Sequence, residues 1–412
     1  MMIYKSPIKI DNVEETRNEL SKSAGVIVFG TGNVGLIALN SLKNQNIDVI
    51  CLSDNNISRW GDVINGCKII PPEELKSTEN KTPILIANNL NFTYIRRQLR
   101  DLGLTNVYDC DFIFSKLDVD IKECNLTWTE ANLKKEIDLY MYSLSAWKEK
   151  ETSLKVKNID LVLTEKCSLK CKDCSNLMQF YAKPVDEDYD LLIPSINNFM
   201  NTVDYVHEIR LIGGEPLLYK KIDHVINHLL SLKNFGKIII NTNGTIVLKG
   251  DKMKVFQNDK IFFDISNYGK LSRNLDKLLQ ELTRLNIAHN YRTQTSWQDA
   301  GRIVKTNRTD EENKEIFGNC CQNQGLSILH GKLYLCPFSA NATNLKGIPY
   351  AKKDIVDLNI DDKKELKRQI SELYFNTEFL EACRACKGRH SNVDTVPVAV
   401  QTKVPLKYAI VS

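Results

Sequence analysis

The stretch IDLVLTEKCSLKCKDC, residues 159–174, joins an apolar run to three closely spaced cysteines. The run Ile159–Leu163 predicts a strand. Cys167, Cys171 and Cys174 follow at the point where that strand would end. In α/β folds the reactive groups collect in loops at the carboxyl ends of the strands. The stretch therefore predicts a strand that leads into a metal-binding loop.

Three thiolates leave a metal centre with an open coordination position. They complete neither a tetrahedral zinc site nor an ordinary four-cysteine iron–sulfur cluster, so a substrate or cofactor could occupy the remaining position. The alternative is a zinc site with a fourth ligand from far along the chain, for example Cys320 or His390. Zinc ligands usually come in closer CxxC pairs, which favours the iron–sulfur interpretation.

Strand and helix patterns alternate after these cysteines. Helical patterns at 219–233 and 273–285 separate apolar strand candidates. The candidates are Glu208–Ile212, Lys237–Asn241, Ile261–Ile265 and Ala288–Tyr291. Such alternation predicts a parallel sheet or a partial barrel.

A second α/β pattern lies near the amino terminus. The segment Gly30-Thr-Gly32-Asn-Val-Gly35 matches G-x-G-x-x-G between an apolar run and a helical pattern, and Asp54 follows Gly35 by nineteen residues. Glycines there permit a tight turn and let a phosphate approach the helix amino terminus, and the acid suits a ribose. The pattern predicts a Rossmann-like domain with a nucleotide bound by Gly30, Gly32, Gly35 and Asp54. A module of this fold without a ligand is the alternative.

Composition limits the classes of function. The 55 Lys and Arg residues against 51 Asp and Glu give a net charge of +4 over 412 residues, which provides no strong field for nucleic acid or an anionic membrane. No apolar run reaches the roughly 18–20 residues of a membrane span, and no signal peptide is recognisable. We therefore expect a cytoplasmic protein without nucleic-acid or membrane partners. In that reducing compartment, clustered cysteines indicate metal ligands or redox groups.

The pattern CxxxCxxC after a first strand resembles the signature of the radical S-adenosylmethionine (SAM) superfamily. The resemblance continues in Gly213-Gly214-Glu215-Pro216, which is similar to the GGEP motif of that family. It implies that Cys167, Cys171 and Cys174 hold a 4Fe-4S cluster whose remaining iron binds SAM. It also implies a partial (β/α)6 barrel.

The same resemblance implies contacts to SAM. Glycine carbonyls and the Glu215 carboxylate would receive the SAM ammonium. The motifs NTNG (241–244) and DISN (264–267) end the third and fourth predicted strands, as polar motifs of the family do. The implied SAM-binding residues are Gly213, Gly214, Glu215, Asn241, Asn243, Ser266 and Asn267. Asp173 stands where the family often has an aromatic residue that contacts adenine. The implied catalytic residues are Cys167, Cys171, Cys174 and Glu215.

A second cysteine group follows the predicted barrel. Its members are Cys320, Cys321, Cys336, Cys383 and Cys386. The group resembles the Twitch extension, a shortened SPASM domain, and implies one auxiliary 4Fe-4S cluster on four of these thiols. Neighbouring side chains in an extended segment point to opposite faces, so only one of Cys320 and Cys321 should bind, and Cys321 is the marginal choice. A structural zinc on the same ligands is the alternative.

Four segments are predicted: a Rossmann-like domain over 1–120, a helical linker over 121–154, the radical SAM barrel over 155–310 and the Twitch-like domain over 311–412. The resemblance implies that SAM yields a 5′-deoxyadenosyl radical that removes hydrogen from a small-molecule substrate. We expect dehydrogenation of a sugar or nucleotide-linked sugar, with electrons from a flavodoxin or ferredoxin. The alternatives are a peptide-modifying maturase, an epimerase that uses the spare cysteine, and a non-enzymatic metal-binding module.

Overall fold

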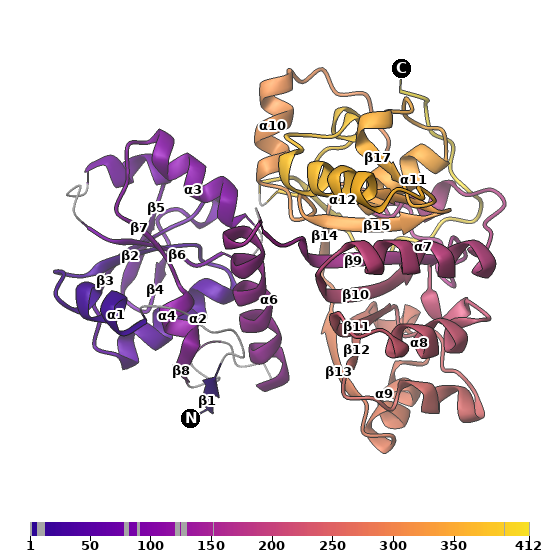
Figure 1. The fold of residues 1–412 in the computed structure, drawn as a ribbon, viewed down its shortest axis with the longest axis horizontal. Helices are drawn as coiled ribbons and strands as arrows, with labels where there is room; N and C mark the ends of the chain where they lie inside the picture. Colours follow the sequence, from indigo (N-terminus) through magenta and orange to yellow (C-terminus); the bar gives the residue numbers. More distant parts are fainter. Residues whose placement is uncertain are drawn as a thin grey trace. The chain divides into compact units, whose positions relative to one another are not determined.

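The computed structural model describes residues 2–5, 13–77, 82–88, 91–119, 124, 130–150, 152–390 and 392–411. The chain divides into two compact units, Met1–Lys148 and Glu149–Ser412. Each unit has its own sheets and its own hydrophobic core (Figure 1). The mixed α/β class with parallel sheets, predicted from the sequence, is confirmed.

The first unit is built on a six-stranded sheet with the order β4-β5-β3-β2-β6-β7. Neighbouring strands are parallel except β4 and β5. The strands are β2 (Val26–Phe29), β3 (Val49–Ser53), β4 (Val63–Ile64), β5 (Cys67–Ile70), β6 (Ile84–Ile86) and β7 (Val107–Asp109). The helices around it are α1 (Val13–Ser21), α2 (Asn33–Asn44), α3 (Phe92–Asp101) and α4 (Asp111–Ser115). A separate antiparallel pair joins β1 (Met2–Lys5) to β8 (Lys116–Val119).

Helix α6 (Glu130–Lys148) packs into the core of the first unit, whereas the sequence predicts a linker there. Leu133, Ile137 and Tyr140 are buried in that core. The Tyr140 hydroxyl donates to the Ile86 carbonyl at 2.8 Å and accepts from the Cys110 N–H at 2.7 Å. These bonds attach α6 to the sheet. The sequence predicts Thr129 as the amino-terminal cap of this helix, and Thr129 lies outside the described residues.

The second unit contains an eight-stranded sheet with the order β13-β12-β11-β10-β9-β15-β16-β17. Strands from β13 to β15 in this order are parallel, and the last two are antiparallel to their neighbours. The strands are β9 (Lys155–Thr164), β10 (Tyr205–Gly213), β11 (Phe235–Thr242), β12 (Ile261–Asn267), β13 (Ala288–Thr293), β15 (Gly325–Leu329), β16 (Lys332–Tyr334) and β17 (Ile355–Asp357). The five strands predicted between Ile159 and Tyr291 are confirmed.

Helices cover one face of this sheet (Figure 1). Ile159, Leu161 and Ile209 pack in the main core with side chains of these helices. The covering helices are α7 (Tyr189–Thr202), α8 (Ile222–Ser231), α9 (Leu275–Arg284) and α12 (Lys363–Ser371).

The opposite face carries polar residues, because side chains alternate along a strand. Asn158 pairs in register with Glu208, and Asp160 pairs with Arg210. Ser327 of β15 pairs with Asp160 on the other side. We call the surface formed by these five residues the polar face. Arg210 binds both carboxylate oxygens of Asp160, at 2.5 and 2.9 Å.

The remaining strands and α-helices of this unit follow β13 in sequence. They are β14 (Ser296–Gln298), α10 (Asp310–Gly318), α11 (Pro337–Asn344) and β18 (Thr395–Pro397). β14 and β18 pair antiparallel. The partial barrel and the Twitch-like extension stay predictions.

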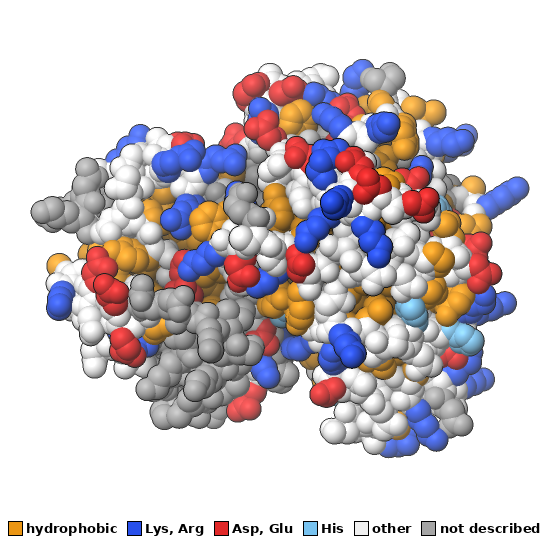
Figure 2. Space-filling view, in the orientation of Figure 1, with side chains coloured by type: hydrophobic (Ala, Val, Ile, Leu, Met, Phe, Trp, Pro, Cys, Tyr) orange, Lys and Arg blue, Asp and Glu red, His pale blue; other side chains and the backbone are white. Residues whose placement is uncertain are grey.

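The surface drawn in Figure 2 carries basic and acidic side chains interspersed, in agreement with the small net charge. In the part of the chain that the structure describes, no helix is long and apolar enough to cross a membrane.

Candidate metal centre and cofactor site

Cys167, Cys171 and Cys174 lie in the loop after β9, where the sequence predicts them. We call them the first cysteine group. Cys171 is buried in an apolar cluster with Leu169 and Ala399, and Cys167 and Cys174 pack against that cluster. Burial raises the pKa of the Cys171 thiol to about 11 and raises those of Cys167 and Cys174. The loop thus gathers three thiols in an environment with little access for water.

A distant segment forms one wall of this loop. Lys172 N–H donates to the Val400 carbonyl and Thr402 N–H donates to the Lys170 carbonyl, both at 2.7 Å. The Gln401 amide donates to the Cys171 sulfur at 3.3 Å. The sequence gives no sign of this pairing, because the partners are 230 residues apart.

Two aromatic rings belong to the same apolar cluster. Tyr268 and Trp297 pack against it and meet edge to face, with ring centroids 5.4 Å apart. Asp173 stands where the radical SAM family often has an aromatic residue. Its carboxylate accepts a hydrogen bond from Arg302 Nε at 2.8 Å. Sequence reasoning missed both rings because they come from segments outside the recognised motif.

Gly213 and Gly214 let the end of β10 approach the cysteine loop. A Cβ on Gly213 would lie 2.2 Å from the Thr164 carbonyl oxygen, and its φ is +141°. A Cβ on Gly214 would lie 2.2 Å from the Lys166 carbonyl oxygen and 2.8 Å from Cys167 Cβ. Any other residue would push the two strand ends apart.

Glu215 is fully buried at this junction. Its carboxylate accepts hydrogen bonds from the Thr242 hydroxyl at 2.8 Å, Asn243 N–H at 2.9 Å and Leu217 N–H at 3.2 Å. Burial raises its pKa to about 7, although these hydrogen bonds oppose the shift. Glu215 therefore ties the end of β11 to the end of β10, in addition to any contact with a cofactor.

The other implied SAM contacts lie at the carboxyl ends of β11 and β12. The Asn243 amide donates to the Cys167 sulfur at 3.6 Å and to Ser168 Oγ at 3.2 Å. Asn241 Oδ1 is buried without a hydrogen-bond partner among the described residues. Asn267 donates to Thr293 Oγ1 at 3.1 Å, and the carbonyl of Ser266 accepts from Ser272 Oγ. The structure thus brings Asn243 directly to the cysteine loop.

The second cysteine group surrounds an apolar cavity. Its thiol-bearing lining residues are Cys320, Cys336, Cys383 and Cys386. Phe317, Phe338 and Leu380 complete much of the wall. Cys321, the marginal choice from the sequence, does not line the cavity. The structure thus brings Cys320, and not Cys321, to the same cavity as Cys336, Cys383 and Cys386.

Cys321 lies among cations. A hydrogen bond from the Cys320 thiol, followed by the charge of Arg389, lowers the pKa of Cys321 to about 6. Arg389 also donates to the Ser175 carbonyl at 2.9 Å, next to Cys174. Its guanidinium interacts electrostatically with Cys174 and with several thiols of the second group. Arg389 is thus a cation shared by the two cysteine groups.

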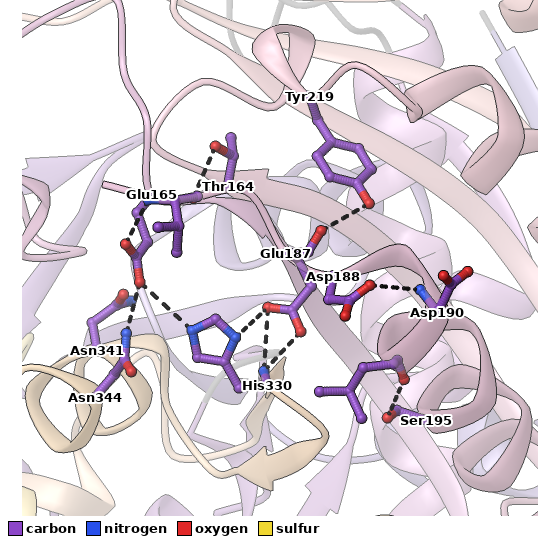
Figure 3. Close-up of polar contacts among 12 residues, drawn as sticks. Thr164, Glu165, Glu187, Asp188, Asp190, Ser195, Tyr219, His330, Asn341 and Asn344 are labelled. Atoms are coloured by element: carbon purple, nitrogen blue, oxygen red, sulfur yellow. Dashed lines mark hydrogen bonds and ion pairs between the residues drawn. The ribbon is translucent and has the colours of Figure 1, made fainter. Parts of the chain in front are cut away.

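A third polar cluster lies at the carboxyl ends of β9 and β15 (Figure 3). His330 lies between two buried carboxylates, with Nδ1 2.9 Å from Glu187 and Nε2 3.6 Å from Glu165. Hydrogen bonds to Glu165 and then Glu187 raise the pKa of His330 to about 10. Asn344 donates to Glu165 at 2.8 Å. These contacts of His330 and Asn344 fix the start of the cysteine loop to the turn between β15 and β16.

The glycine-rich turn of the first unit is largely used for internal packing. Thr31 N–H and Oγ1 both donate to Asp54 Oδ2 at 2.7 Å, and Asn56 N–H donates to Oδ1 at 2.8 Å. A Cβ on Gly35 would lie 2.0 Å from the Gly30 carbonyl oxygen, whereas nothing lies within 4 Å of one on Gly32. Asp54 holds the turn closed. A nucleotide at this turn stays a prediction.

The donor set of the cysteine loop fits an iron–sulfur cluster held by three thiolates. Cys167, Cys171 and Cys174 share one apolar cluster and have no fourth thiol beside them in it. Across the described ranges, no three Cys, His, Asp or Glu side chains converge enough to hold a metal ion as they stand. Binding would therefore require these thiols to turn toward a common centre and lose their protons.

Comparison with known proteins gives partial matches. The family model "C2185-like, N-terminal" matches residues 22–107. The mitochondrial GTP 3′,8-cyclase of Arabidopsis thaliana is 34% identical over 89 residues, which are 21% of this chain and 22% of that enzyme. The chain thus spans about a fifth of the length of that relative.

Two solved structures are similar over larger parts of the chain. BtrN in complex with AdoMet and 2-DOIA is 14% identical, with 61% of this chain and 98% of BtrN covered and a TM-score of 0.33. Streptococcus suis SuiB bound to S-adenosylmethionine is 12% identical, with 72% and 84% covered and a TM-score of 0.33.

Proposed function

We propose that this chain is a radical SAM enzyme that holds a 4Fe-4S cluster on Cys167, Cys171 and Cys174. The observation that carries the proposal is the close approach of Gly213 and Gly214 to the cysteine loop, which puts the GGEP motif beside Cys167. The partial similarity to a GTP 3′,8-cyclase supports it.

The residues around the loop have separate tasks. When bound, the cluster and SAM supply a 5′-deoxyadenosyl radical that removes hydrogen from the substrate. Backbone carbonyls at Gly213 and Gly214, with the carboxylate of Glu215, would hold the SAM ammonium. Tyr268 and Trp297 offer apolar surface beside the thiols and exclude water from the reacting groups.

We propose that the second cysteine group holds an auxiliary cluster on Cys320, Cys336, Cys383 and Cys386. Their shared apolar cavity supports this assignment. An auxiliary cluster can accept an electron from a substrate radical, which favours dehydrogenation of a sugar or nucleotide-linked sugar. A flavodoxin or ferredoxin would supply the electron that starts the reaction.

Epimerisation is the second candidate, and Cys321 is the observation that favours it. This thiol lies outside the apolar cavity and near Arg210 of the polar face. It could return hydrogen to the opposite side of a substrate carbon. Dehydrogenation gives a product with two fewer hydrogens, whereas epimerisation in heavy water gives a product of unchanged composition that carries one deuterium.

Iron analysis and SAM cleavage test the main proposal. Anaerobically reconstituted protein should contain about eight irons, and the variant with Cys167, Cys171 and Cys174 replaced by Ala should contain about four. Dithionite and SAM should yield 5′-deoxyadenosine only with the wild-type loop. Cys51→Ala, in the core of the first unit, is the matched control and should change neither result. Equal iron content in the triple variant and the wild type would refute the assignment.

A further inference from the structure

Arg389 joins the loops of the two cysteine groups through hydrogen bonds. Its Nη2 donates to the carbonyl of Ser175, directly after the first cysteine group, at 2.9 Å. Its own carbonyl accepts from Cys321 N–H at 3.3 Å. On the preceding residue, Gly388 N–H donates to the Cys386 sulfur at 3.3 Å. The side chain and the backbone around Arg389 therefore hold the two loops together.

The guanidinium of Arg389 keeps its charge although it is partly buried. Burial opposes the charge, but the thiolates of the second cysteine group outweigh this effect and raise the pKa of Arg389. Burial raises the pKa of Cys174, while nearby backbone N–H groups and the charge of Arg389 oppose the rise. Burial also raises the pKa of Cys336, and there the charge of Arg389 is the first opposing effect. One positive charge thus acts on a thiol of each group.

Arg308 is a second cation beside the second cysteine group. Its Nη2 donates to the carbonyls of Cys383 and Cys386. Burial raises the pKa of Cys386 to about 11, and the charges of Arg389 and Arg308 are among the effects that oppose the rise. The two arginines differ in reach, since Arg389 also contacts the loop of the first group.

A cation at this place favours the reduced form of a cluster. Reduction adds one electron to a cluster, so its negative charge grows by one unit. The potentials of iron–sulfur clusters depend on charges and hydrogen bonds around them. We propose that Arg389 is a positioning residue whose positive charge raises the reduction potentials of both clusters together. The inference rests on the proposed function, which supplies the two clusters.

Redox titration of the reconstituted full chain, followed by electron paramagnetic resonance, tests this role. In Arg389→Gln the ratio of reduced to oxidised cluster at a fixed applied potential should fall roughly tenfold for both clusters. A unit charge about 10 Å away at an effective dielectric constant of about 20 has an effect of this size. Arg389→Lys keeps the charge and should stay close to the wild type. The variant with Cys167, Cys171 and Cys174 replaced by Ala identifies the signal of the second cluster.

Two other arginines are matched controls. Arg308→Gln should lower the ratio of reduced to oxidised cluster for the second cluster alone. Arg284→Gln should change neither cluster, because Arg284 lies on α9 and pairs with Glu281. If Arg308→Gln shifted both clusters as much as Arg389→Gln does, the shared role assigned to Arg389 would be wrong.

The outcomes separate this inference from the proposed function. About eight irons per chain in Arg389→Gln, with unchanged ratios or a change at one cluster only, would overturn the inference alone. If Arg389→Gln loses iron, retention of iron in Arg389→Lys supports the role of the charge, and loss in both variants overturns it. A reconstituted wild type without two clusters would refute the proposed function, and the inference with it.

Discussion

Cys320 and Cys321 are neighbours in sequence with different surroundings. Cys320 faces the apolar cavity with three other thiols, and Cys321 faces Arg389. The two thiols do not point to opposite faces as alternation along an extended segment would have it: residues 321–324 form a turn, and the Cys320 thiol is hydrogen-bonded to Cys321. The thiols that share the cavity with Cys320 come from distant segments of the chain, at Cys336, Cys383 and Cys386, and leave no local signal beside it.

Single replacements of these two cysteines should have different effects. Cys320→Ala should lower the iron content by about four atoms per chain, because the apolar cavity loses one of its four thiols. Cys321→Ala should keep the wild-type iron content. Iron analysis and electron paramagnetic resonance of both variants provide the measurement. Loss of iron in Cys321→Ala, together with wild-type iron content in Cys320→Ala, would show that Cys321 is the ligand in place of Cys320.

Gly214→Ala should disrupt the first cysteine group. The added Cβ would lie 2.2 Å from a backbone oxygen, so the strand end must move, at a cost of about 1–3 kcal/mol in the free energy of unfolding. We expect lower stability and loss of iron from the cluster on Cys167, Cys171 and Cys174. Gly32→Ala is the comparison, because it meets nothing within 4 Å and should leave the iron content unchanged. Retention of all iron in Gly214→Ala would contradict this account.

At the scale of elements, the sequence predicts the strands well. It does not predict the polar contacts that join the ends of strands far apart in the chain. The run Ile159–Leu163 lies within β9, and Glu208–Ile212 lies within β10, because apolar runs are a local signal. The turn between β15 and β16 carries His330, for which the sequence gives no local sign of a role. Its role depends on Glu165 and Glu187, which come from a different part of the chain.

Replacement of His330 should weaken this connection in a pH-dependent way. The pKa of His330 is raised from 6.5 to about 10, so the contribution of its ion pairs to stability is fully present below about pH 6.5 and is lost as the pH rises through about 10. His330→Gln should lower the free energy of unfolding by about 1 kcal/mol at about pH 6, since solvent screens the partly exposed ring. Urea unfolding of both proteins should show this difference shrinking toward pH 10. A difference that does not vary with pH would exclude this charge effect.

At the scale of the whole molecule, the chain consists of two units with separate cores. The sequence predicts an α/β pattern in each half. It places the helix at 130–148 in a linker, because an amphipathic pattern does not say which core the helix joins. Leu133 and Ile137 attach that helix to the first unit.

Tyr140→Phe should destabilise the first unit alone. The change leaves the Cys110 N–H and the Ile86 carbonyl without their buried partner, which costs about 1–3 kcal/mol. Calorimetry should resolve two transitions, of which only one moves in the variant. Iron content should not change, because the cysteines proposed to bind the clusters lie in the other unit. A single transition that shifts as a whole would indicate that the units unfold together.

The wall that residues 400–402 build around the cysteine loop has a consequence for biosynthesis. Gln401 is made 230 residues after Cys171, which at roughly 5–20 residues per second is a delay of about 10–50 s on the ribosome. During that interval the three thiols emerge without their shield and meet water, oxygen and stray metal ions. Loading with iron is thus best timed after translation has passed this segment, and a carrier that delivers iron earlier would have to protect the nascent loop itself.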